Sequence, residues 1–163
     1  MKMVTNMKEL LEAGDIRGFE TRDMDTVLDI WLRASIRAHD FVDREFWEAR
    51  LEDVRDLYIP DSETYVYEKS GEVRGFFSLE NFTLAALFVA PDSQGRGIGR
   101  CLLDRAKSLR IRLTLTVYKE NRKSVRFYVR NGFVRTRERV DPYTGHKELV
   151  LEYTDNRKTV ARS

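Results

Sequence analysis

Three glycines alternate with other residues directly after an apolar segment, and this arrangement is typical of a phosphate-binding loop. The apolar segment ends at Val89, the glycines are Gly95, Gly97 and Gly99, and a helix is expected to begin at Ile98. Glycine permits positive φ and close approach of the backbone to a ligand, and the first turn of a helix offers free N–H groups. We therefore expect a ligand that carries a phosphate or a pyrophosphate.

Two common phosphate-binding motifs differ from this loop in spacing. A P-loop would continue with Gly-Lys-Ser/Thr, but Arg100 and Cys101 follow Gly99, which excludes it. A dinucleotide-binding Gly-x-Gly-x-x-Gly motif would place glycine at Leu102, which disfavours that motif, although Glu120 stands at the distance of its ribose-binding acid.

Two segments together resemble the GNAT N-acetyltransferase superfamily. The spacing Gln94-x-x-Gly97-x-Gly99 resembles that superfamily's acyl-CoA pyrophosphate loop. The segment 121–133, Asn-Arg-Lys-Ser-Val-Arg-Phe-Tyr-Val-Arg-Asn-Gly-Phe, resembles its pattern Asn-x-x-Ala-x-x-Phe-Tyr-x-x-x-Gly-Phe, with Ser124 in the alanine position. The motifs lie within about residues 82–133, and the order of elements extends the resemblance to about residues 16–153.

The resemblance implies acetyl-CoA as co-substrate and no metal. The strand before the loop would pair with pantetheine, the loop would surround the pyrophosphate, and the start of the downstream helix would lie beside them. The residues implied for cofactor binding are Leu87, Phe88, Val89, Gln94, Gly95, Arg96, Gly97, Ile98, Gly99, Arg100, Asn121 and Ser124.

The implied reaction is direct attack of a primary amine on the acetyl thioester. Tyr128 aligns with the tyrosine that protonates the departing CoA thiolate, and a phenol of ordinary pKa about 10 is protonated at neutral pH. Packing beside Phe127 is the alternative role for Tyr128. The general base is less clearly marked, because Thr116 stands where some relatives carry glutamate and residues 82–89 contain no acid or histidine. Glu80 is the leading candidate and Tyr118 the second.

The segment Ala38-His39-Asp40-Phe41 lies between the first two expected helices, where this superfamily forms its acceptor pocket. His39 and Phe41 are therefore expected to bind substrate, and His39 is also a candidate base. The alternative is that Asp40 caps a turn and His39 lies on the surface.

Periodicity predicts an α/β protein with the element order of the GNAT fold. We expect a mixed, mostly antiparallel sheet of about seven strands, splayed between strands 4 and 5, with four helices packed on both faces. Residues 1–15 are expected to be an N-terminal tail, 16–153 the acetyltransferase domain and 154–163 a C-terminal tail. The expected strands are 16–22, 64–69, 72–80, 82–89, 111–118, about 133–140 and 147–153, and the expected helices are 24–38, 43–58, 98–109 and one from Asn121.

Composition favours one domain and an uneven distribution of charge. The chain has 163 residues, 42% of them hydrophobic, and a single cysteine that excludes an internal disulfide. Residues 1–93 contain 11 Lys/Arg and 20 Asp/Glu, whereas residues 94–139 contain 14 and 3. The basic segment suits the phosphates of CoA and the acidic one a cationic amine.

Location and partners follow from the same observations. No segment resembles a signal peptide or a membrane span, so we expect a cytoplasmic protein without a membrane partner. The acceptor would be an amine on a small molecule, a protein lysine or a protein N-terminus, and a homodimer is left open. The alternatives are a CoA-binding regulatory domain without turnover and, although we expect no nucleic-acid partner, an RNA-linked amine acceptor.

Overall fold

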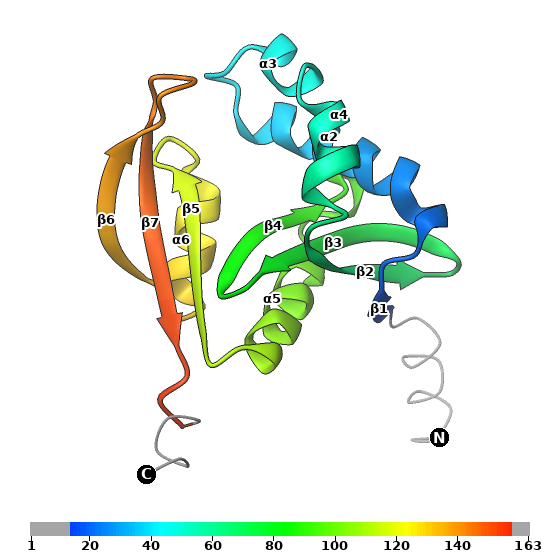
Figure 1. Ribbon diagram of the computed structural model, residues 1–163. Coiled ribbons are helices and arrows are strands. Elements are labelled where there is room, and N and C mark those ends of the chain that lie inside the picture. Colours follow the sequence, from blue (N-terminus) through cyan, green and yellow to red (C-terminus); the bar gives the residue numbers. More distant parts are fainter. Residues whose placement is uncertain (1–13, 158–163) are drawn as a thin grey trace.

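A seven-stranded mixed sheet in the order β1-β2-β3-β4-β5-β7-β6 forms the centre of the computed structural model, which describes residues 14–157 (Figure 1). All neighbouring strands are antiparallel except β4 and β5. The strands are β1 (Asp15–Gly18), β2 (Glu63–Lys69), β3 (Glu72–Glu80), β4 (Thr83–Val89), β5 (Arg112–Tyr118), β6 (Val134–Val140) and β7 (Lys147–Thr154). This sheet confirms the fold class expected from the sequence. Of the two expected tails, residues 1–13 and 158–163 lie outside the described residues, whereas Asp15 belongs to β1 and Thr154 to β7.

Helices cover both faces of the sheet (Figure 1). The α-helices are α2 (Met24–Ala38), α3 (Arg44–Glu48), α4 (Leu51–Asp53), α5 (Ile98–Leu109) and α6 (Arg122–Arg130), the 3-10 helices are η1 (Thr21–Asp23) and η3 (Pro91–Ser93), and η2 (Val54–Tyr58) is a π-helix. The buried side chains of α2 recur at Val27, Ile30, Trp31 and Ala34, which is the spacing of one helical face.

Two hydrophobic cores lie on opposite faces of the sheet. Successive side chains on a strand point to opposite faces, and the fully buried Phe76 and Phe77 on β3 accordingly belong to different cores. Phe77 packs in the core that contains α5 and α6 residues such as Leu102 and Tyr128. Phe76 packs in the core that contains residues of α2 and α3 such as Trp47.

The single helix expected over residues 43–58 is wrong. The structure breaks it into α3, α4 and η2. In the π-helical turn, the N–H of Ile59 donates to the carbonyl of Val54 at 3.0 Å, so residues five apart are stacked. Val54 and Ile59 are therefore buried, whereas Leu57 and Tyr58, which a regular helix would turn inward, are 52% and 59% exposed.

The sheet splays between β4 and β5. These strands share one register position, Thr83 opposite Thr114, where the N–H of Thr114 donates to the carbonyl of Phe82 at 2.9 Å. Beyond it, β5, β7 and β6 diverge from β4 (Figure 1). On its other edge β4 carries a bulge, because Ser78 pairs with Ala86 while Leu79 pairs with Leu84, and Ala85 is the extra residue. Within residues 14–157, no helix has the length and apolar composition needed to cross a membrane.

Candidate active site

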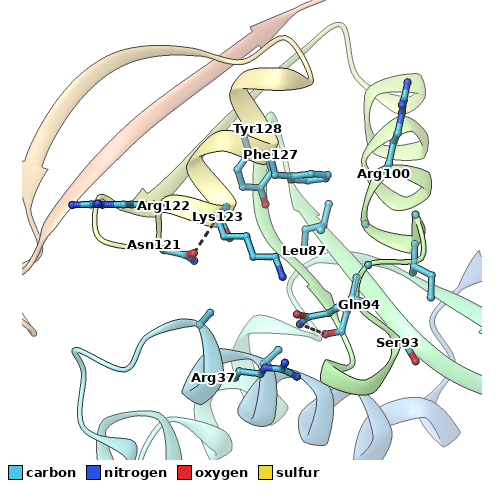
Figure 2. Close-up of a pocket in the computed structure, with 18 of the residues that line it drawn as sticks. Arg37, Leu87, Ser93, Gln94, Arg100, Asn121, Arg122, Lys123, Phe127 and Tyr128 are labelled. Carbon is cyan, nitrogen blue, oxygen red and sulfur yellow. Dashed lines mark hydrogen bonds between the residues drawn. The ribbon is translucent and has the colours of Figure 1, made fainter.

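A cavity of about 660 Å³ lies where β4 and β5 diverge, between α2, the glycine loop and α6 (Figure 2). Its lining includes Tyr128 and all residues expected to bind the cofactor except Phe88 and Arg96. The side chain of Phe88 stacks on Phe76 on the other face of the sheet, at 5.7 Å between ring centroids, and Arg96 is exposed. The structure therefore gathers both sequence motifs around one space.

Two of the three glycines in the loop adopt the positive φ that the sequence predicts for them. Gly95 and Gly97 have φ of +78° and +83°, and Gly97 is the N-cap of α5. Gly99 has no positive φ; its role is close packing, because a Cβ there would lie 3.6 Å from the Phe127 ring. Gln94 fixes the loop to β4 by donating from Nε2 to the carbonyl of Val89 at 3.1 Å. A loop of this form directs backbone N–H groups and a helix N-terminus toward an anion.

Cationic side chains surround the same cavity. Arg37 on α2, Arg100 on α5, and Arg122 and Lys123 on α6 line it, and Arg37 and Lys123 lie on opposite sides of its mouth (Figure 2). The carboxylate of Glu120, which also lines it, lies 2.7 Å from Nδ1 of His146. The loop and the cations together fit the phosphates of CoA. The sequence alone does not mark Arg37, Arg122 or Lys123 as binding residues, because cations at a cavity mouth follow no fixed spacing along the chain.

Tyr128 lies on the inner face of α6 and borders the cavity. Its ring packs between Phe127 and Phe133, at 5.2 and 5.4 Å between centroids, and 9% of the residue is exposed. Burial raises the pKa of its phenol, which is therefore protonated at neutral pH. Figure 2 shows the Tyr128 side chain directed into the cavity. The geometry suits a proton donor.

His39 is buried, so the alternative that it lies on the surface is wrong. It is 8% exposed, stacks on Trp47 at 4.9 Å, and lines neither this cavity nor the second one described below. Its Nδ1 lies 2.8 Å from the carbonyl of Ser35. Burial lowers the pKa of its imidazole, which favours the neutral ring. Phe41 lies beside it, in contact with the rings of His39, Tyr118 and His146.

Glu80 lines a second cavity, of about 320 Å³, and not the cofactor cavity. The bulged Ala85, its neighbour Ala86, and Arg50 also line this second cavity. The other candidate base, Tyr118, donates its hydroxyl to Asp141 Oδ2 at 2.5 Å, and burial raises its pKa. A phenol with a raised pKa does not ionise readily, so Glu80 is the stronger candidate of the two.

Known proteins resemble this chain in sequence and in fold. A family model described as an acetyltransferase (GNAT) domain matches residues 60–135. The peptidyl-lysine N-acetyltransferase YiaC of Escherichia coli is 34% identical over 119 residues, which are 72% of this chain and 82% of YiaC. The apo solution structure of YjaB from Escherichia coli superimposes with a TM-score of 0.77 at 30% identity and covers 86% of this chain and 97% of its own.

A more distant structure contains the cofactor. The PaiA N-acetyltransferase of Thermoplasma acidophilum, in complex with coenzyme A, has a TM-score of 0.76 at 17% identity and covers 88% of this chain and 99% of its own. At that identity the likeness is one of fold. The loop, the splayed sheet and the sequence relatives agree, and this chain belongs to the GNAT family as an acetyl-CoA-dependent N-acetyltransferase.

Proposed function

We propose that the protein acetylates the ε-amine of lysine in a protein or peptide. Both YiaC and YjaB, which is 33% identical over 128 residues, are named peptidyl-lysine N-acetyltransferases. The observation that carries the proposal is the pair of cavities, one bordered by β4 residues Leu87 and Val89 and the other by Ala85 and Ala86 of the same strand. Donor and acceptor would reach β4 from two sides and meet near its bulge.

Acetyl-CoA supplies an acetyl group as a thioester, which a neutral amine attacks directly. Residues 94–100, with Arg37 and Lys123, would hold its phosphates. The extra residue Ala85 lies outside the regular pairing of β3 and β4, and a free N–H at such a bulge is suited to stabilise the negative charge that develops on the carbonyl oxygen.

Two side chains would move the protons. Glu80, in the second cavity, would take a proton from the lysine ammonium or from a water beside it, because an amine of pKa about 10 is mostly protonated at neutral pH. As the new C–N bond forms and the C–S bond breaks, Tyr128 would give its proton to the CoA sulfur, and the second proton of the attacking nitrogen would pass through water to the Tyr128 phenolate. The proton that Glu80 takes up would return to solvent. The products are an acetylated lysine and the free CoA thiol.

The test is release of free CoA thiol with a panel of lysine peptides, polyamines, amino acids and aminoacyl-tRNA, comparing the native protein with Tyr128→Phe. Turnover on lysine peptides that falls about 10²- to 10³-fold in the variant is expected if Tyr128 is the acid. The variant removes one oxygen from a ring already packed among aromatics, so its fold and its affinity for acetyl-CoA should remain.

Other outcomes would identify other functions. Turnover confined to aminoacyl-tRNA and lost at high salt would indicate an RNA-linked acceptor. Tight acetyl-CoA binding without turnover on any acceptor would indicate a CoA-binding regulatory domain. Equal turnover by the native protein and Tyr128→Phe would mean that Tyr128 is not the general acid.

A further inference from the structure

A chain of hydrogen bonds crosses the open end of the gap between β4 and β5. On one side, α2 packs on β3 and β4, and near its end the carbonyl of Ser35 lies 2.8 Å from Nδ1 of His39. On the other side, Asn121 begins α6, and its Oδ1 accepts from the N–H of Ser124 at 3.3 Å. Between them, Asn121 Nδ2 lies 3.4 Å from His39 Nε2. His39 therefore joins the two halves of the splayed sheet.

The partners determine where the hydrogens lie. The Ser35 carbonyl can only accept, so Nδ1 of His39 carries the hydrogen, and in a neutral ring Nε2 is then an acceptor. Asn121 must direct Oδ1 toward the Ser124 N–H that it caps, which leaves its Nδ2 to donate to His39. Every group in the chain has a complementary neighbour as long as His39 is neutral.

Aromatic rings from both halves hold His39 in place. Trp47 on α3 stacks on the imidazole at 4.9 Å with an interplanar angle of 25°, and Tyr118 on β5 contacts it edge-on at 5.3 Å. Because His39 lines neither cavity, these contacts do not bring it to a substrate. Among the described residues, the His39 side chain is connected to the lining of the cofactor cavity through its bond to Asn121.

We propose that His39 is a positioning residue that sets the width of the acetyl-CoA cavity, and that it neither binds the acceptor nor acts as a base. Ala34 and Arg37 of α2 form one wall of the cavity, and Asn121 and Tyr128 belong to the facing wall. At the other end of the gap the strand pair at Thr83 and Thr114 holds the halves together. A cavity held at both ends needs little rearrangement to bind its ligand, so loss of one end lowers affinity.

The experiment measures equilibrium binding of CoA by calorimetry, without any acceptor. His39→Phe keeps a planar ring for Trp47 to stack on but removes both nitrogens, and CoA should bind about 5- to 10-fold more weakly, as expected for one hydrogen bond. His39→Gln retains a neutral acceptor within reach of Asn121 and should bind CoA within about twofold of the native protein.

A double-mutant cycle separates the bridge from helix capping. In Asn121→Ser, the shorter side chain can still cap α6 but cannot reach His39. Within that background, His39→Phe should have little further effect on CoA affinity, because the bond is already absent. Tyr65→Phe is the control: it removes a hydroxyl bond to Glu63 from a ring that stacks on Phe77 and lines neither cavity, and it should leave CoA affinity unchanged.

Two results would overturn the proposal. If His39→Phe leaves CoA affinity within twofold of native while kcat on a lysine peptide falls, His39 acts on the acceptor or on proton transfer. If the effects of His39→Phe and Asn121→Ser on CoA affinity simply add, the two residues act separately. The CoA affinities in both comparisons do not depend on which amine the enzyme acetylates, so a wrong acceptor assignment would leave the binding test intact.

Discussion

The two cavities that border β4 are built in different ways. The cofactor cavity is formed largely by two short stretches, from Leu87 to Arg100 and from Glu120 to Tyr128, and its glycine loop presents backbone. The second cavity takes its lining from four separate segments, including Trp31 on α2, Arg50 before α4, and Glu80 on β3, and it presents side chains. A lining of backbone N–H groups suits the phosphates of CoA, whereas a lining of side chains would suit the proposed role of distinguishing one acceptor from another.

The charges near the two cavities also differ. Cations line the cofactor cavity, whereas the segment beside the second cavity, which also contains Arg50 and Arg55, exposes a larger set of carboxylates, namely Glu52, Asp53, Asp56 and Asp61. Opposite fields on the two sides would attract an anionic donor to one and a cationic acceptor to the other. The comparison therefore predicts that substitutions on one side change donor binding and substitutions on the other change acceptor turnover.

Among the substitutions that test this comparison, the largest effect is expected on the acceptor side. Glu80→Gln should lower kcat on a lysine peptide about 100-fold, the range expected for loss of a general base, and leave acetyl-CoA affinity unchanged. The matched control is Glu72→Gln at the other end of β3, where the carboxylate pairs with Arg74 at 3.1 Å. Steady-state kinetics of both variants, with calorimetry for acetyl-CoA, check the prediction. A normal kcat for Glu80→Gln would mean that the base lies elsewhere.

On the donor side, Gly97→Ala should weaken acetyl-CoA binding about tenfold or more. Gly97 has φ of +83°, which alanine adopts only with strain of about 1–3 kcal/mol, so the loop should shift away from the conformation that presents its N–H groups. Gly71→Ala is the control, because Gly71 has φ of +77° in the β2–β3 turn and, like Gly97, no atom within 4 Å of an added Cβ. Thermal unfolding should show similar destabilisation in both variants, and acetyl-CoA affinity should fall only in the first.

Secondary structure is predicted best from the sequence where residues that are close together along the chain determine it. The bounds expected for α2, β3 and α5 match the structure, because each has regular periodicity between clear end signals. The cofactor loop was found for the same reason: its glycines and the Asn121 segment are contiguous motifs. Tertiary contacts only had to bring the two motifs together.

The acceptor side was predicted less well because its structure depends on contacts between distant segments. The π-helical turn at Val54–Tyr58 arises where Val54 and Ile59 are both buried in the core, and no regular spacing of apolar residues in the sequence predicts it. Burial of His39 depends on Trp47 and Tyr118, which are 8 and 79 positions away along the chain. Glu80 was a candidate base on the grounds of its chemical group and its position at the end of a strand, and the structure places it in a cavity separate from the cofactor's.

The buried His39, which the bond to Asn121 connects to α6, predicts an effect of pH on stability that is smaller than the two effects above. Because burial lowers the pKa of His39, the unfolded chain takes up a proton there more readily than the folded protein does. The free energy of unfolding should therefore decrease as pH falls below the ordinary histidine pKa of about 6.5, by at most about 1.4 kcal/mol per pH unit. Urea unfolding between pH 7.5 and 5 should show this decrease in the native protein and a flatter profile in His39→Gln. His146 is present in both proteins and cancels in the comparison, so parallel profiles would contradict the prediction.

The smallest expected effect distinguishes cations at the cofactor cavity from cations elsewhere on the same helix. Lys123 and Arg126 are both exposed on α6, but only Lys123 lines the cavity. Lys123→Gln should weaken acetyl-CoA binding about two- to fivefold, the value of an exposed ion pair, and 0.5 M salt should reduce the difference. Arg126→Gln, which removes the same charge three residues along α6, should change affinity by less. Equal losses in both variants would mean that the basic segment acts through its overall electrostatic field. Net charge would then contribute to acetyl-CoA affinity as much as the shape of the glycine loop does.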